Sequence, residues 1–224
     1  DGDYDRAVKN LQRAEREAQD GRTAVRTHLL LGATYLELKL WDKATLQYNK
    51  ASKLASASNE IIMPNKKWYI SEATLKEGIA LVQSHRASEA IGLLQNFIAN
   101  NKGDARNEEA LFWLAESFYK IELLKNASDT YQKLLDLYPN SSRREEILYG
   151  LGWSYFRVKD FNNSSKIFDQ MIKEFPKSKY AVEVLTRQAD GYYMEKRFAN
   201  AVSSYKRAAE LSKGTEEGQY ASYQ

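Results

Sequence analysis

The stretch Leu148–Pro176, LYGLGWSYFRVKDFNNSSKIFDQMIKEFP, holds a pattern of large and small residues that the chain repeats at a fixed interval. The recurring positions are Leu148, Leu151, Gly152, Tyr155, Ser164, Phe168, Met171 and Pro176. Thirty-seven residues earlier they hold Leu111, Leu114, Ala115, Phe118, Ala127, Tyr131, Leu134 and Pro139. Thirty-seven residues later they hold Leu185, Gln188, Ala189, Tyr192, Ala201, Tyr205, Ala208 and Lys213. Such a period predicts an array of structural repeats.

Two more copies of the pattern precede these three. One lies a further 37 residues back and consists of Thr74, Glu77, Gly78, Leu81, Ala90, Leu94 and Phe97. The other lies 46 residues before that copy and consists of His28, Leu31, Gly32, Tyr35, Ala44, Tyr48 and Ala51. We expect the nine extra residues of this step within Ser56–Asn65, where Ile61, Ile62 and Met63 occur. This insertion is either a lengthened linker or an element that contacts a partner.

The repeats define the expected organisation of the chain. Because a repeat array has no internal boundary, we expect residues 1–224 to form a single solenoid that is a fragment of a longer protein. The expected parts are a half repeat at 1–20, complete repeats at about 22–56, 66–102, 105–139, 142–176 and 179–213, and a half repeat at 215–224.

The spacing of apolar residues by three and four predicts helices, and no strand-like alternation occurs. Each repeat then forms a helical hairpin whose apolar face is buried by its neighbours. Small residues are expected where the two helices of a hairpin approach closely, namely Gly32, Gly78, Ala115, Gly152 and Ala189. We also expect the first helix to end near Gly21, and Ser142 to form a capping box with Glu145.

The order of these residues resembles the tetratricopeptide (TPR) motif, W-x2-L-G-x2-Y followed by A-x3-F and P, with about three residues added to its period. The resemblance implies an all-α solenoid of antiparallel helical hairpins stacked into a right-handed superhelix. The links at Pro139 and Pro176 follow an aromatic residue and precede serine. They resemble links in TPR proteins of the bacterial envelope, such as the periplasmic partner of the Tol-Pal system and the lipoprotein of the outer-membrane barrel assembly machinery. This resemblance favours a periplasmic or outer-membrane-associated location and leaves the cytoplasm open.

The composition excludes several classes of protein. The formal charge is only +3 and the charged residues of both signs alternate, which disfavours a nucleic-acid-binding face. No apolar run approaches the length of a membrane span. The chain contains no cysteine, so disulfides, thiolate metal sites and cysteine nucleophiles are excluded from it.

The sequence offers little for catalysis. Only His28 and His85 are histidines, and the repeat places them apart, with His28 in a core column. Two carboxylate pairs occur, Glu108 with Glu109 and Glu216 with Glu217. The members of each pair are adjacent in the sequence and point to different helical faces. We therefore predict no catalytic residue, no metal site and no cofactor.

The inner face of the first helices is the expected binding surface, because in TPR proteins this face lines a concave groove that holds a partner segment. The predicted partner-binding residues are Phe112, Glu116, Tyr119, Lys120, Tyr149, Trp153, Phe156, Arg157, Asp190 and Tyr193. The alternative interpretation is that these aromatic side chains pack on neighbouring first helices. Aromatic residues and arginine dominate binding energy at interfaces.

The sequence thus predicts a non-enzymatic scaffold that binds another protein or peptide segment. Two other functions remain open. The array could be a structural spacer or self-association module that forms a homo-oligomer, or a regulatory arm of a larger enzyme.

Overall fold

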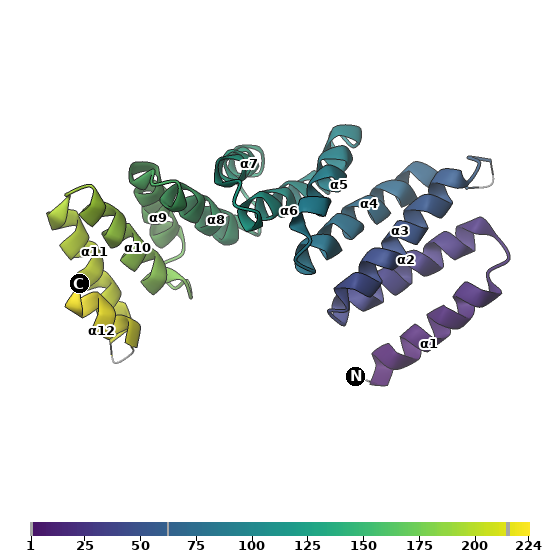
Figure 1. The fold of residues 1–224 in the computed structure, drawn as a ribbon, viewed down its shortest axis with the longest axis horizontal. Helices are drawn as coiled ribbons and strands as arrows, with labels where there is room; N and C mark the ends of the chain where they lie inside the picture. The colour runs from purple at the N-terminus through teal and green to yellow at the C-terminus, as the bar shows by residue number, and fades with distance from the viewer. Residues whose placement is uncertain (1, 62, 214–215) are drawn as a thin grey trace. The chain divides into compact units, whose positions relative to one another are not determined.

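A computed structural model describes residues 2–61, 63–213 and 216–224, together with their side chains except those of Glu216 and Glu217. Three parts of the sequence predictions therefore lie outside the described residues. They are Ile62 of the insertion, Thr215 of the last half repeat and the side chains of the carboxylate pair Glu216 and Glu217. The described residues form helices and contain no strand, which confirms the all-α fold (Figure 1). No helix among them is both long enough and apolar enough to cross a membrane.

The helices fall into two compact units. Unit 1, Asp1–Ile121, contains α1 (Gly2–Glu17), α2 (Gly21–Glu37), α3 (Trp41–Ala57), α4 (Lys66–Gln83), α5 (Ala87–Asn100) and α6 (Asn107–Lys120). Unit 2, Glu122–Gln224, contains α7 (Leu124–Leu137), α8 (Arg144–Arg157), α9 (Phe161–Glu174), α10 (Ala181–Met194), α11 (Phe198–Leu211) and α12 (Glu216–Tyr223). Each unit is described by itself. A single solenoid over residues 1–224 stays a prediction.

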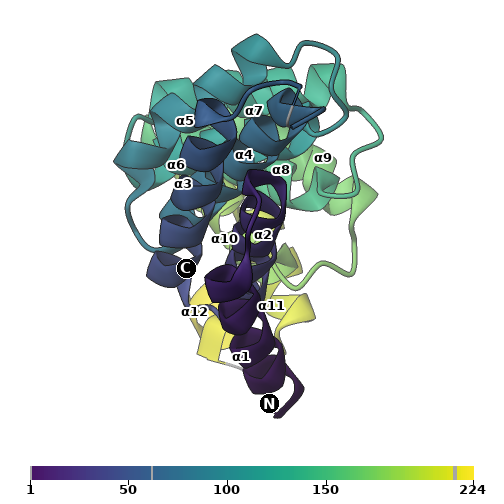
Figure 2. The same ribbon diagram turned by 90° about the vertical axis from the view of Figure 1, so that its right-hand side faces the viewer.

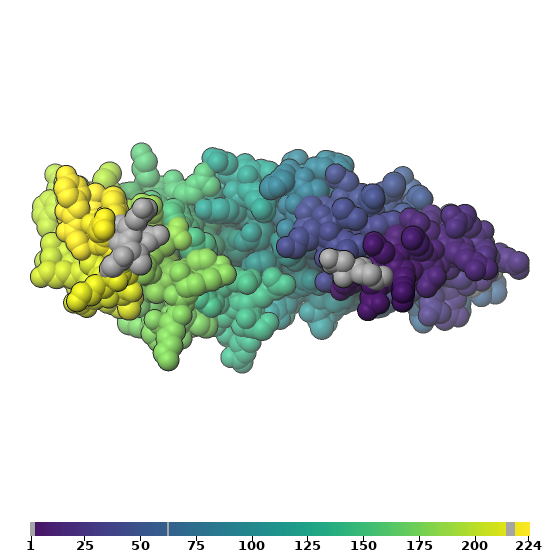
Figure 3. Space-filling view, turned by 90° about the horizontal axis from the view of Figure 1, so that it is seen from below, coloured from purple at the N-terminus to yellow at the C-terminus, as the bar shows by residue number. Residues whose placement is uncertain are grey.

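Packing within each unit follows the order of the sequence. Each helix packs on the next one, and the even-numbered first helices also contact one another, α2 with α4 and α4 with α6 in unit 1, and α8 with α10 and α10 with α12 in unit 2 (Figures 1 and 2). Helices further apart in the sequence make no such contacts among the described residues of either unit. The exposed side chains of α1 belong to the purple surface in Figure 3. This nearest-neighbour packing is the property that defines a solenoid.

The link between each first helix and the following second helix has one conformation throughout. Every such link has three residues, and its middle residue adopts a positive φ although none is glycine. These left-handed residues are Lys39, His85, Glu122, Lys159 and Lys196, with φ between 56° and 66°. Left-handed residues commonly end helices, so the same sharp turn recurs in every copy of the repeat.

The small residues of the pattern lie where the sequence predicts close approach. A side chain on Gly32 would collide with the ring of Tyr48, one on Gly78 with Leu94, and one on Gly152 with the ring of Phe168. All three partners are fully or almost fully buried. The second helix of these hairpins therefore packs directly against the backbone of the first.

The nine extra residues are placed differently from our expectation. They do not all lie within Ser56–Asn65, because α3 has 17 residues and α4 has 18, whereas α5 to α11 have 14 each. Three extra residues lengthen α3, four lengthen α4, and two lengthen the link at 58–65 relative to the six-residue links at 101–106, 138–143 and 175–180. Since α2 also has 17 residues, the three helices extend together at one edge of unit 1.

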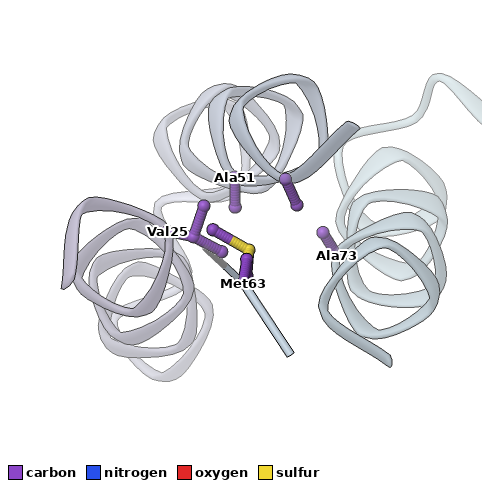
Figure 4. Packing of buried hydrophobic residues seen from close by; sticks show 5 residues of the cluster. Val25, Ala51, Met63 and Ala73 are labelled. Atoms are coloured by element: carbon purple, nitrogen blue, oxygen red, sulfur yellow. The ribbon is translucent and has the colours of Figure 1, made fainter. Parts of the chain in front are cut away.

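This extended edge has its own small core. Met63 is 0% exposed and packs with Val25 of α2, Ala51 and Ala55 of α3 and Ala73 of α4 (Figure 4). Leu29, Tyr69 and Ile70 pack around this cluster. The described residues of the link are thus part of the fold and are anchored by Met63.

Two expected helix ends are wrong. The first helix ends at Glu17, and Gly21 instead begins α2, because Asp20 caps that helix by accepting hydrogen bonds from the Thr23 amide at 2.8 Å and hydroxyl at 2.7 Å. Ser142 forms no capping box, since α8 begins at Arg144 without a side-chain cap. The turn is made one residue earlier, where the Ser141 hydroxyl accepts the Arg143 amide.

Candidate partner-binding surface

The inner face of unit 2 carries a row of aromatic side chains from α8. Tyr149, Trp153 and Phe156 follow one another at about one helical turn, with ring centroids 6.2 Å and 5.6 Å apart and edge-to-face geometry. The row continues at both ends, where Tyr149 stacks on Tyr180 at 4.4 Å and Phe156 meets Phe161 at 5.4 Å. All five side chains are partly exposed. We call these five residues the aromatic row; their mutual contacts hold the rings in fixed orientations.

The aromatic row also contacts the neighbouring first helix, α10. The Tyr149 hydroxyl donates a hydrogen bond to Glu183 Oε2 at 3.0 Å, and the guanidinium of Arg187 lies 5.7 Å from the centre of the Trp153 ring. Each pair is 34 residues apart. The rings therefore pack on a neighbouring first helix, as the alternative interpretation expects. They also remain partly exposed, so this packing does not cover them completely.

Asp190 is held by two groups of unit 2 and is not an isolated acid. Its Oδ2 accepts a hydrogen bond from Arg187 Nη1 at 2.8 Å, and its Oδ1 accepts one from the Tyr205 hydroxyl. Burial of Tyr205, together with this hydrogen bond and the nearby charge of Asp190, raises the pKa of the phenol. Asp190 thus positions the Arg187 guanidinium over Trp153.

In unit 1, ion pairs connect α4 with α6 and with the residue just before α6. Lys76 of α4 lies 3.0 Å from Glu109 of α6, and Arg106 binds Glu72 at 2.8 Å and Asp104 at 2.6 Å. The hydrogen bonds from Arg106 lower the pKa of Asp104 to about 2. The Lys76–Glu109 and Arg106–Glu72 pairs span 33 and 34 residues, close to the 34 of the contacts between the aromatic row and α10, whereas Asp104 is a local partner of Arg106.

The other predicted residues of unit 1 have different environments. Phe112 is buried and lies edge-to-face against Trp113, so it supports α6 from inside and drops out of the candidate surface. Glu116 and Tyr119 are partly exposed, and Lys120 is exposed at the end of α6. Among the predicted residues of unit 1, only Glu116, Tyr119 and Lys120 therefore reach the surface.

The remaining predicted residues of unit 2 lie at the hairpin ends. Arg157 forms an ion pair with Glu122 at 2.7 Å. Tyr193 is 60% exposed and pairs edge-to-face with Phe198, which is 55% exposed. Sequence reasoning missed Tyr180, Phe161, Phe198 and Arg187 as neighbours of the predicted set. The offset of 34 residues, one repeat less about one helical turn, is the signal that identifies Arg187 from Trp153.

The two histidines lie in separate environments. His28 is buried in unit 1, with Nδ1 2.7 Å from Gln47 Oε1 and 3.7 Å from Glu15. This agrees with the core position that the repeat predicts for His28. His85 is the left-handed residue of the α4–α5 link. Across the described ranges, no cluster of three His, Asp or Glu side chains is arranged to hold a metal ion.

Glu77 is a buried carboxyl at a core position of α4, where other copies of the repeat carry leucine or glutamine. Burial raises its pKa, and a hydrogen bond of 2.8 Å from Asn49 opposes that rise. A raised pKa means that the folded state binds the proton more tightly than the unfolded state, so stability falls as pH rises from the ordinary glutamate value of about 4.3 through the raised value.

Replacing Glu77 with glutamine is therefore expected to remove this fall, because the amide stays neutral and still accepts from Asn49. Urea unfolding of both proteins between acid and neutral pH checks this. The variant should gain stability relative to the original chain as pH rises, and a constant difference between the two curves would contradict the assignment.

Comparison with known proteins agrees with the repeat. Two family models, both described as tetratricopeptide repeat, match residues 75–142 and 146–178. These two stretches of the chain are therefore similar to tetratricopeptide repeats. A comparison with curated proteins gave no significant match.

Solved structures show the same fold. A structure of MamA from AMB-1 is 16% identical, with 86% of this chain and 93% of that chain covered and a TM-score of 0.67. A crystal structure of MamA protein is 19% identical, with 83% and 90% covered and a TM-score of 0.67. A Podosopora anserina putative kinesin light chain with nearly identical TPR-like repeats is 10% identical, with 87% and 97% covered and a TM-score of 0.66. At these identities the likeness establishes the fold alone, a TPR-like helical solenoid.

Proposed function

We propose that this chain is a non-enzymatic scaffold that binds a segment of another protein on the inner face of its first helices. The aromatic row of unit 2 is the principal contact, and the exposed Tyr193 of the same unit is part of the proposed surface. Tetratricopeptide repeats generally mediate protein interactions, and neither matching family model describes an enzyme.

The observation that carries this proposal is the partial exposure of the aromatic row. The core columns of α8 are filled by Leu148 and Leu151, which are fully buried, so the rings of the row are not required to close the hairpin. They are nevertheless ordered by their mutual contacts and by Arg187. Rings that are fixed before binding lose little conformational entropy when a partner covers them.

Two buried N–H groups at this surface add support. Nε1 of Trp153 and Nε of Arg187 have no hydrogen-bond partner among the described residues. Buried donors without an acceptor cost free energy and are uncommon in folded proteins. A backbone carbonyl of a bound segment supplies the missing acceptor if the two side chains shift on binding.

The test is loss of partner capture in the double variant Trp153→Ala with Phe156→Ala. Proteins retained from the source organism by the original chain are identified by mass spectrometry, and the affinity of the main partner is then measured by calorimetry. We expect a loss of more than about 2 kcal/mol, or about 30-fold, because buried aromatic residues are the usual hot spots.

The control is Leu137→Ala, which removes an exposed apolar side chain of unit 2 outside the aromatic row. It should bind as tightly as the original chain. Circular dichroism must show equal helical content for all three proteins. Equal affinity of the double variant and the control would contradict the assignment of the aromatic row as the partner-binding surface.

A location in the bacterial envelope is part of the same proposal. Its support is the pair of aromatic-Pro-x-Ser links, in which Ser141 and Ser178 each accept the backbone amide two residues ahead, at 3.1 Å and 3.0 Å. Fractionation of the source organism, with the native protein followed by antibody, tests this placement.

A further inference from the structure

The second helix of one hairpin packs on the first helix of the next hairpin, and we call each such contact a joint. The joints whose residues can be compared are α1–α2, α3–α4 and α5–α6 in unit 1, and α7–α8 and α9–α10 in unit 2. The same two repeat positions recur in each of them, one on either helix. These positions are 19 residues apart, or 28 in the α3–α4 joint that holds the nine extra residues.

The residues at the two positions fall into two classes. Three joints combine a glutamine of the second helix with a buried leucine of the following first helix, namely Gln12 with Leu31, Gln95 with Leu114, and Gln132 with Leu151. The other two combine two polar residues, of which the one on the second helix is shorter than glutamine, namely Asn49 with Glu77, and Asp169 with Gln188. None of these five joints mixes the two classes.

Both polar pairs are connected by a direct hydrogen bond, and the two bonds run in opposite directions. In the α3–α4 joint the Asn49 side chain donates to Glu77 Oε1 at 2.8 Å. In the α9–α10 joint Gln188 Nε2 donates to Asp169 Oδ1, also at 2.8 Å. Glu77 and Gln188 are buried where the other joints carry leucine, so each of them depends on a partner for its polar group.

The Gln188 amide has partners for both of its ends. Its Nε2 also donates to the backbone carbonyl of Ser165 at 3.1 Å, and its Oε1 accepts from the Ser204 hydroxyl at 2.9 Å. The Tyr192 hydroxyl donates to Asp169 Oδ2 at 3.4 Å. A single side chain of α10 is thus bonded to α9 and to α11, which a leucine at this position could not achieve.

A helix from one class of joint fits poorly into the other class. If α4 of another copy stacked on α9, the Asp169 carboxylate would face the Glu77 carboxylate. If α8 of another copy stacked on α9, Leu151 would replace Gln188 and leave Asp169 without its donor. Polar groups that lose their partner in an interface cost free energy, so such contacts are disfavoured. The leucine joints do not discriminate in this way, because one leucine can replace another.

We infer that the two polar pairs specify which hairpin stacks on which, with one pair in each unit. Repeats of similar shape can associate in the wrong order, and such misassembly is a characteristic failure of repeat proteins. A buried polar pair fixes the register of packed helices because it accepts only a complementary partner. This role is separate from partner binding, since none of the four residues belongs to the aromatic row.

The first experiment replaces the polar pair of unit 2 by leucines, Asp169→Leu with Gln188→Leu in the full chain. The protein is unfolded in urea, refolded at high concentration and analysed by size-exclusion chromatography with light scattering. The original chain should return to one species, and the variant should form additional, larger species. Its unfolding midpoint should not fall, because both polar partners are removed together.

The matched control is Gln132→Leu. It adds a leucine at the position equivalent to Asp169, but in a leucine joint, so no polar pair is lost. This variant should refold to one species like the original chain. The control therefore separates the loss of the pair from the addition of an apolar side chain.

The second experiment transfers the pair of unit 1 into unit 2. Gln188→Glu places a carboxylate against Asp169 and should raise the equilibrium constant of unfolding at neutral pH by at least about tenfold. Asp169→Asn in the same background recreates the pair of Asn49 with Glu77 and should restore most of the loss. Urea unfolding followed by circular dichroism measures both changes.

Four results would overturn the inference. Two come from the leucine variant, namely refolding to a single species and a lowered unfolding midpoint, which would make the pair a contributor to stability alone. The third is equal association of Gln132→Leu, which would trace the larger species to the added leucine. The fourth is failure of Asp169→Asn to restore Gln188→Glu, which would mean that the two residues do not act as a pair.

Discussion

Met63→Ala is expected to lower the free energy of unfolding by about 2–5 kcal/mol, the range measured when a buried methionine or leucine is cut back to alanine. Met63 is fully buried between α2, α3 and α4, and the alanines around it cannot expand to fill the space that it leaves. The midpoint of urea unfolding, followed by circular dichroism, checks the size of the loss.

Ile61→Ala is the matched control for Met63→Ala. It removes a large side chain from the same link, but Ile61 is exposed, so its stability should stay within about 0.5 kcal/mol of the original chain. Equal effects of the two substitutions would mean that the link is not anchored as described. The pair therefore tests whether the insertion is an ordered element or a slack linker.

Gly152→Ala is expected to destabilise the chain by about 3 kcal/mol, near the upper end of the cost of overpacking a core. An added methyl would lie 2.6 Å from Cδ1 of Phe168, whose ring is fully buried and has no room to withdraw. The two helices α8 and α9 must then separate. Thermal and urea unfolding measure the loss, and Phe168→Leu in the Gly152→Ala background should recover part of it.

Gly92→Ala is the opposite case on the same repeat architecture. Gly92 lies in α5, and a methyl there would meet no atom within 4 Å. Alanine should therefore raise stability by about 0.5–1 kcal/mol, the usual difference in helix propensity. If both glycine substitutions destabilised by similar amounts, the close contact of Gly152 with Phe168 would not be the cause.

The repeat could be predicted from the sequence because its signal is the packing itself. Gly32, Gly78 and Gly152 recur at the positions where a second helix meets the first, and Tyr48, Leu94 and Phe168 recur opposite them. Each hairpin solves the same local packing problem, so the same residue sizes return at the same interval.

Features that break the period were harder to predict. The nine extra residues carry a helical pattern at both ends, and Pro64 was the only strong signal between them, so their division among α3, the link and α4 was not visible. Gly21 was misassigned because glycine also occurs next to a capping aspartate, here Asp20. The Arg143 amide donates to the hydroxyl of Ser141 and not to that of Ser142, because the proline turn sets which hydroxyl faces this amide.

The candidate surface was predicted only in part because exposure depends on neighbours. Phe112 and Tyr149 occupy equivalent positions 37 residues apart, yet Phe112 is buried and Tyr149 is partly exposed. In unit 1, Lys76 of α4 forms an ion pair with Glu109 of α6. In unit 2, the Arg187 guanidinium of α10 lies over the ring of Trp153 of α8. Neighbouring first helices are therefore joined by opposite charges in unit 1 and by an aromatic ring with a cation in unit 2. Helical periodicity alone does not reveal these partners.

The uniform three-residue turns restrict where this chain tolerates extra sequence. A left-handed residue at the centre of such a turn leaves no slack, so an added residue there would rotate the following helix out of its packing register. Connections between successive hairpins already differ in length, as the eight residues at 58–65 show beside the six at 138–143. Natural length variation, epitope tags and grafted sensor peptides should therefore be accommodated between hairpins and rejected within them.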